Sequence, residues 1–399
     1  MLTACFSTIF ISYAVRYGYG VLLPKMLPAL DISKAEAGVI YSSFFIAYTV
    51  ASPVLGLLGD RYNIKALLTT FVALFGAGTL LMAFSSTIVQ ASLFFALAGV
   101  GSAVCWAPTM ALAQRWTGTK RKGRTLAFID VGSAVGIIGT SAVLPWVVNA
   151  FDWQAGWLTL GSLALAIALL NGAAVRNPPP DTASPEAMTV RRASKSPREI
   201  YLELFQNRRF WMIGLAYLLT GFAIIVPFTF LSTYAEQELS FSYEVATRLI
   251  TIIGIGAIVG KVILGPLSDT VGRAKVLMVC AVLITGGTLG MAFTRGPFLI
   301  IIVALFSLGY GAAWSMFAAA ASDYFPKENA GSIIGLWTMY LGAGSVVAPI
   351  ISGWLADTTG TLRWAFIMAA GAGFVSLLLL LPLWRVAPVP ETRPDTGQV

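Results

Sequence analysis

The chain contains no histidine, the side chain that most often binds metals and carries protons near neutral pH. Only three cysteines occur, Cys5, Cys105 and Cys280, and each lies inside an apolar run without the spacing of a disulfide framework or a metal site. We therefore expect no metal and no cofactor.

Motifs of enzymes and of ATP-driven pumps are also missing. The sequence has no G-x-S-x-G nucleophile elbow, no cluster of paired carboxylates in its apolar runs and no G-x-x-x-x-G-K-[ST] phosphate loop. These absences argue against an enzyme and against a primary pump.

Charge is scarce, which excludes a water-soluble domain. Charged residues make up 11% of the 399 residues and hydrophobic residues 57%, and the mean hydropathy is +0.80. A helix needs about 20 mainly apolar residues to cross a bilayer. Twelve such runs are present, near 5–28, 37–59, 66–86, 88–114, 126–149, 156–175, 210–234, 245–267, 274–294, 297–321, 331–355 and 364–384.

An internal repeat divides the chain. Gly56-Leu57-Leu58-Gly59-Asp60 follows the second run, and Gly265-Pro266-Leu267-Ser268-Asp269 follows the eighth, 209 positions later. Because each half has an even number of spans, both halves have the same orientation. We predict an N-terminal half at 1–175, a cytoplasmic linker at 176–209, a C-terminal half at 210–384 and a cytoplasmic tail at 385–399.

The formal net charge of +8 has a topological explanation. Nineteen of the 26 Lys and Arg residues lie in the loops after even-numbered spans or in the tail. Positive loops stay in the cytoplasm, so we expect a multi-pass inner-membrane protein with both termini cytoplasmic. The basic residues then contact anionic membrane lipid and do not indicate a nucleic-acid partner.

Both repeat copies resemble the G-x-L-x-D-R-x-G-R-K signature of the major facilitator superfamily. This resemblance implies an all-α polytopic membrane protein, with 12 transmembrane helices in two six-helix halves, that works by alternating access and is a monomer. The matching residues are Gly56, Leu58, Asp60, Arg61 and Lys65 in the first copy, and Gly265, Leu267, Asp269, Gly272, Arg273 and Lys275 in the second.

The resemblance also implies a conformational latch. In the family the aspartate docks on the other half, and the basic residue four positions later meets an acid after span 4 or 10. Arg273 and Asp323 retain that pair in the second half, whereas the first half has Ile64 and Arg115. The alternative is that these charges only fix topology. The latch residues are Gly56, Asp60, Arg61, Gly265, Asp269, Arg273 and Asp323.

A narrower resemblance begins at Lys120. The run Lys120-Arg121-Lys122-Gly123-Arg124-Thr125-Leu126-Ala127, followed by Gly132 and Gly136, is similar to monocarboxylate and oxalate/formate carriers. The organic-anion symporter branch is an equally fair relative. Phe95 and Gly136-Ile137 stand where proton-driven drug exporters of the superfamily have an arginine and a glycine-proline pair.

Arg16 lies about eleven residues into the first run, roughly 16 Å deep at ~1.5 Å per residue. An arginine at that depth costs about 2.5 kcal/mol or more, so it needs a functional or structural reason. We expect Arg16 to bind a substrate carboxylate, with Tyr13 and Tyr17 as hydroxyl donors. A fixed ion pair or carbonyl contacts with neighbouring helices would be the structural alternative.

Four other intramembrane residues are candidates. Lys261 stands where the resembling carriers have an arginine and is the second expected anion ligand, although a snorkelling lysine explains it as well. Asp130 is the expected proton carrier, or else the partner of a loop arginine such as Arg115 or Arg124. Tyr310 and Trp314 share one helical face and are expected to lie opposite Arg16.

The sequence thus favours a secondary transporter that moves a small, monocarboxylate-like organic anion with protons. The rival from the same fold is a proton-coupled drug or metabolite efflux antiporter, in which Arg16 would be structural. A sensor that binds without transporting is a third class. Gly132 with Gly136, and Gly256 with Gly260, are spaced for close helix packing.

Overall fold

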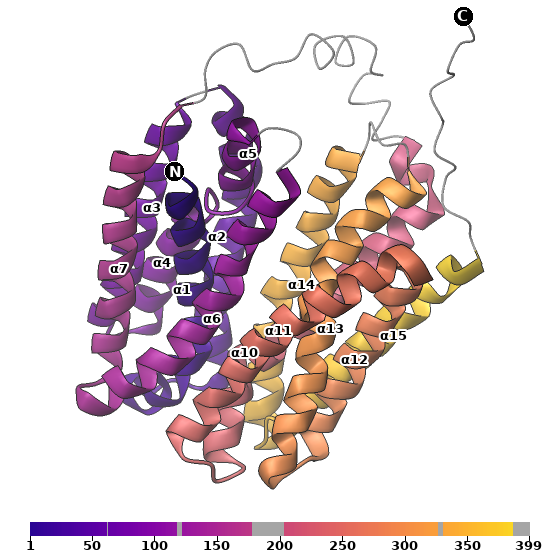
Figure 1. The fold of residues 1–399 in the computed structure, drawn as a ribbon. Helices are drawn as coiled ribbons and strands as arrows, with labels where there is room; N and C mark the ends of the chain where they lie inside the picture. Colours follow the sequence, from indigo (N-terminus) through magenta and orange to yellow (C-terminus); the bar gives the residue numbers. More distant parts are fainter. Residues whose placement is uncertain (62, 118–121, 178–202, 326–329, 386–399) are drawn as a thin grey trace, which may run out of the picture.

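The computed structural model describes residues 1–61, 63–117, 122–177, 203–325 and 330–385, and this part of the chain is helical (Figure 1). Residues 386–399 of the expected tail at 385–399, most of the linker, and Lys120 and Arg121 of the basic run lie outside the described residues. The elements are α1 Leu2–Leu30, α2 Lys34–Arg61, α3 Ile64–Leu81, η1 Met82–Phe84, α4 Ile88–Ser102, α5 Ala107–Trp116, α6 Lys122–Ala150, α7 Trp153–Ala174, α10 Arg208–Gln237, α11 Tyr243–Val271, α12 Arg273–Phe293, η3 Gly296–Phe298, α13 Leu299–Tyr324, α14 Ala330–Thr359, α15 Arg363–Leu380 and η5 Leu381–Arg385.

Twelve helical spans account for the fold. Eleven described segments are long and apolar enough to cross a membrane, and α4 and α5 together form one of them, Ile88–Trp116. The twelfth span is α1, which has the required length but carries Arg16, Lys25 and three tyrosines. The expected 12-helix architecture is therefore confirmed, and its most polar helix is the first.

The repeat seen in the sequence is also a repeat of packing. Helix α1 packs on α6 and α7, α2 on α4, and α3 on α4 and α7. The matching pairs in the second half are α10 with α14 and α15, α11 with α13, and α12 with α13 and α15. Three symmetric contacts join the halves, namely α1 with α10, α2 with α14 and α6 with α11.

The two halves lie side by side, each with its helices running roughly between two common ends (Figure 1). We call one end the linker end, because α7 ends there at Ala174 and α10 begins there at Arg208. The other is the distal end, where α1 gives way to α2 at residues 31–33 and α14 to α15 at residues 360–362.

Glycines let the helices within each half approach closely. A Cβ atom built on Gly136 of α6 would lie 2.3 Å from the Phe10 carbonyl oxygen of α1, and one on Gly132 would lie 2.8 Å from that of Phe6. On α11, a Cβ at Gly260 would lie 2.2 Å from the Leu308 carbonyl oxygen of α13. The expected packing role of these glycines is confirmed.

We predict that Gly136→Ala destabilises the protein, because its methyl group would press on the backbone of α1, which cannot give way as a side chain can. Overpacking of this kind costs about 1–3 kcal/mol. The measurement is the apparent melting temperature in detergent. The matched control is Gly286→Ala on α12, where the new Cβ meets nothing within 4 Å; equal melting temperatures for the two variants would refute the packing argument.

Candidate functional site

Arg16 is the middle residue of α1, the helix of the first half that packs on α10 of the second. Its guanidinium carbon is surrounded by aromatic rings, 4.8 Å from the centroid of Tyr48, 5.3 Å from Tyr13, 5.5 Å from Phe45 and 5.6 Å from Phe44. Each such contact is worth about 0.5–2 kcal/mol, which helps to hold the charge in the bundle.

No acidic side chain neutralises Arg16 within the described part of the chain, where the ion pairs involve other residues. Its buried Nε atom has no hydrogen-bond partner. Aromatic faces attract a cation but do not accept the in-plane hydrogen bonds of a guanidinium. The arrangement therefore leaves a hydrogen-bond donor of Arg16 available to an anion.

Aromatic rings continue from Arg16 into the second half. Tyr17 of α1 stacks on Phe228 of α10 with ring centroids 3.9 Å apart, and Phe228 meets Tyr310 of α13 at 5.0 Å. Tyr310 contacts Trp314 at 6.1 Å. Tyr13, Tyr17, Tyr310 and Trp314, all expected from the sequence, thus form one cluster with Arg16.

Sequence reasoning missed the residues that complete this cluster. Phe44 and Phe45 of α2 were not predicted as site residues, and nothing in the sequence set Tyr48 apart from the other aromatic residues of that span. The four-residue spacing of Phe44 and Tyr48, whose rings stack with centroids 6.4 Å apart, was the available signal. Phe228 had none beyond its place next to Pro227 in a long apolar run.

Lys261 and Asp130 form an ion pair with each other. Lys261 Nζ of α11 donates to Asp130 Oδ2 of α6 at 2.6 Å, and both side chains are roughly 30% exposed. The contact joins the two halves. The structure therefore pairs the expected second anion ligand with the expected proton carrier, and the side chain of Arg124 lies outside the described part of the chain.

The latch residues of the second half form an ion pair near the linker end. Arg273 Nη1 lies 2.8 Å from Asp323 Oδ1, and Arg273 Nη2 lies 3.7 Å from Asp269 Oδ1. Gly56 and Gly265 are not closely packed, because a Cβ on either would meet nothing within 4 Å. The side chains of Asp60 and Arg61 lie outside the described part.

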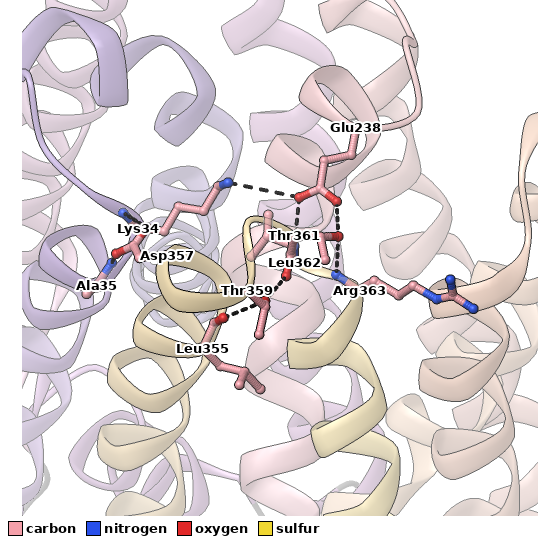
Figure 2. A network of polar contacts seen from close by, with 9 residues as sticks. All are labelled: Lys34, Ala35, Glu238, Leu355, Asp357, Thr359, Thr361, Leu362 and Arg363. Atoms are coloured by element: carbon pink, nitrogen blue, oxygen red, sulfur yellow. Dashed lines mark hydrogen bonds and ion pairs between the residues drawn. The ribbon is translucent and has the colours of Figure 1, made fainter.

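Polar contacts join the halves at the distal end (Figure 2). Asp357 of α14 accepts hydrogen bonds from the backbone N–H groups of Lys34, at 3.1 Å, and Ala35, at 2.8 Å, and so caps α2. The Lys34 ammonium lies 4.0 Å from Glu238, the residue directly after α10. We call Lys34, Ala35, Glu238 and Asp357 the distal contact.

Glu238 is fixed in turn by the segment after α14. It accepts from the backbone N–H of Leu362 at 2.7 Å and from the Thr361 hydroxyl. Nearby, Lys25 of α1 forms an ion pair with Glu236 of α10 at 2.6 Å. Backbones also touch here, since a Cβ on Gly38 of α2 would lie 2.3 Å from the Pro349 carbonyl oxygen of α14. The distal end is closed.

Comparisons with known proteins agree with this architecture. The sequence profile described as Major Facilitator Superfamily matches residues 5–255 and 235–399. The chain belongs to this superfamily. The computed structure is also similar to the crystal structure of the nucleoside transporter NupG, with a TM-score of 0.75, 18% identity and coverage of 96% of this chain and 99% of that one, which shows the shared fold.

Curated members of the superfamily match over nearly the whole chain. The hexuronate transporter of Bacillus subtilis is 25% identical, covering 93% of this chain and 91% of its own length. The membrane sensor protein UhpC of Salmonella typhimurium is 23% identical, with coverages of 97% and 92%. The probable sulfoacetate transporter SauU of Cupriavidus necator is 22% identical, with coverages of 94% and 92%. This superfamily member is a multi-pass membrane transporter, and neither the fold nor the relatives point to an enzyme.

We predict that Asp357→Ala loosens the distal end, because it removes the cap that the second half provides to α2 and leaves only the local cap from Ser33. Loss of such a cap costs about 1 kcal/mol, or about a fivefold change in the ratio of open to closed protein. The reporter is Ser42→Cys in a background without the three native cysteines, since Ser42 is buried and donates across the halves to the Val346 carbonyl oxygen at 2.6 Å. Maleimide labelling of this cysteine should become several times faster.

The matched control for this experiment is Asp152→Ala. Asp152 also caps a helix, accepting from the Ala155 N–H at 2.7 Å, but both residues belong to the first half. Its loss should leave the labelling rate unchanged. If both variants accelerate labelling equally, Asp357 stabilises the fold in general and not the closed distal end.

Proposed function

We propose that this protein transports a small organic anion, with Arg16 as the ligand of its carboxylate. The observation that carries the proposal is the unneutralised Arg16 charge at the centre of the bundle, with a free N–H and hydroxyl-bearing rings around it. A carboxylate that formed two hydrogen bonds with the guanidinium would supply the missing acceptor. Hexuronate and sulfoacetate, named for two relatives, are organic anions too.

The central cluster is suited to alternating access. Arg16 and Tyr17 belong to the first half, whereas Phe228, Tyr310 and Trp314 belong to the second, so a bound anion would contact both. The distal contact closes one path to the site in this conformation. Opening that contact, together with closure at the linker end by the Arg273–Asp323 latch region, would expose the site to the other side.

The proposed setting follows the distribution of basic residues. The linker end faces the cytoplasm of a cell (inner) membrane, both termini are cytoplasmic, and the transporter is a monomer. In this conformation, substrate would reach the central site from the cytoplasm, or leave the site into the cytoplasm.

We predict that Arg16→Gln weakens binding of a monocarboxylate such as glucuronate by about tenfold or more, since a hydrogen bond to a charged group contributes about 1.5–3 kcal/mol. The measurements are ligand-dependent thermal stabilisation of the purified protein and uptake of labelled glucuronate into proteoliposomes. The control is Arg248→Gln, which removes an exposed arginine of α11.

Two other outcomes would favour different functions. Stabilisation by lipophilic cations, unchanged in Arg16→Gln, would support a drug efflux antiporter in which the aromatic cluster is the binding surface. Binding of the anion without any flux would support a sensor, as the relative UhpC is named.

We further propose that the proton is the coupling ion and that Asp130 carries it. A proton on Asp130 would remove the negative charge that holds Lys261, and would free the ammonium group as a second anion ligand. Because the pair bridges α6 and α11, the same proton would also weaken a contact between the halves.

We predict that Asp130→Asn, which resembles the protonated state, abolishes accumulation driven by a pH gradient but retains exchange of labelled for unlabelled substrate. Both are measured in proteoliposomes. Asp31→Asn is the control, because Asp31 is an exposed acid in a left-handed turn that asparagine also tolerates. Accumulation that persists in Asp130→Asn would exclude Asp130 as the proton carrier.

A further inference from the structure

A polar cavity lies at the distal end of the C-terminal half, away from Arg16. Its volume is about 200 Å³, and Tyr234, Glu238, Phe293, Arg295, Thr361 and Arg363 are among the residues that line it. They come from the distal ends of α10 and α12, the turn after α12, and the segment that begins α15. The cavity is thus outside the central cluster and contacts different elements.

The cavity has a net positive charge. Neither Arg295 nor Arg363 forms an ion pair with any residue in the part of the chain that the structure describes. The Arg363 guanidinium lies over the Phe293 ring at 4.4 Å and extends away from the Glu238 network (Figure 2). Glu238 also lines the cavity, but its carboxylate is already held by Thr361, Leu362 and, at 4.0 Å, the Lys34 ammonium, so both arginine charges stay uncompensated in the described part of the chain.

The depth of the cavity fits the headgroup layer of a membrane. It is lined by helix ends, and large aromatic side chains beside it are exposed: Phe293 by 57%, Phe298 by 69% and Trp364 by 50%. Aromatic residues gather where the hydrocarbon core meets the headgroups. Arginines at this level of a membrane come within reach of lipid phosphate groups, which guanidinium binds through paired hydrogen bonds.

We propose that this cavity binds the headgroup phosphate of an anionic phospholipid, between Arg295 and Arg363. A phosphodiester offers oxygens that the two guanidinium groups can bind, and its acyl chains would lie along the exposed aromatic side chains beside the cavity, which free phosphate would not use. The proposal depends only on the membrane setting of this end of the bundle and not on Arg16 or on the transported anion.

The bound lipid would lie directly beside the distal contact. Arg363 donates from its backbone N–H to the Thr361 hydroxyl oxygen at 3.1 Å, and the Thr361 hydroxyl in turn donates to Glu238. A lipid phosphate on Arg363 therefore touches the segment that fixes Glu238. Its occupancy would stabilise the closed distal end.

The experiment measures thermal stabilisation of the delipidated protein in detergent, with phosphatidylglycerol or phosphatidylcholine added at equal concentration. We expect phosphatidylglycerol to raise the melting temperature more than phosphatidylcholine, and the Arg295→Gln/Arg363→Gln variant to lose that difference. The control is Lys275→Gln, which removes a cation near the linker end, where the ammonium lies 5.6 Å from the Trp384 ring. This variant should still be stabilised more by phosphatidylglycerol than by phosphatidylcholine.

A double lysine variant and two soluble phosphate compounds also test the cavity between Arg295 and Arg363. If the double glutamine variant does not fold, Arg295→Lys/Arg363→Lys retains the charges but not the paired hydrogen bonds, and should reduce the phosphatidylglycerol effect. Glucuronate stabilisation should be unchanged in the folded variants, which separates this site from Arg16. An undiminished lipid effect in the variants, or equal stabilisation by soluble glycerophosphoglycerol or inorganic phosphate, would overturn the proposal.

Discussion

The arginine at the centre of α1 is the constraint around which the rest of the bundle is arranged. A guanidinium charge in the middle of a membrane protein is tolerated only where the surrounding protein compensates for the lost water. Here four aromatic rings provide part of that compensation, and no acidic group neutralises the charge within the described residues. The remaining positive charge of Arg16 attracts negative charge into a bundle otherwise built mainly from apolar side chains.

Charges elsewhere in the bundle are handled differently. Lys261 is matched by Asp130, Lys25 by Glu236 and Arg273 by Asp323, and each pair joins separate helices. Two of these pairs cross between the halves, so they contribute to the choice between conformations and not only to stability. Because each half repeats the packing of the other, small differences among such contacts decide which end is closed.

The sequence was most informative where a property depends on position along one helix. Run length and the spacing of the repeated loops predicted the twelve spans, and depth along α1 singled out Arg16. Contacts between distant helices were beyond it: Asp130 and Lys261 are 131 residues apart, and nothing local distinguishes Phe228 from other buried phenylalanines. The distal contact was also missed, because Asp357 caps α2 across more than 300 residues, a pairing that depends on how the two halves dock.

The polarity of α1 has a consequence for how the protein enters the membrane. Of the twelve spans, α1 is the one that the length and hydropathy of a membrane-crossing helix do not single out, so it gains less free energy than the others from entering lipid alone. Its partners α6 and α10 begin 92 and 178 residues after α1 ends. We therefore expect α1 to depend on these later helices for its final place in the membrane, so Arg16 also influences the order of assembly.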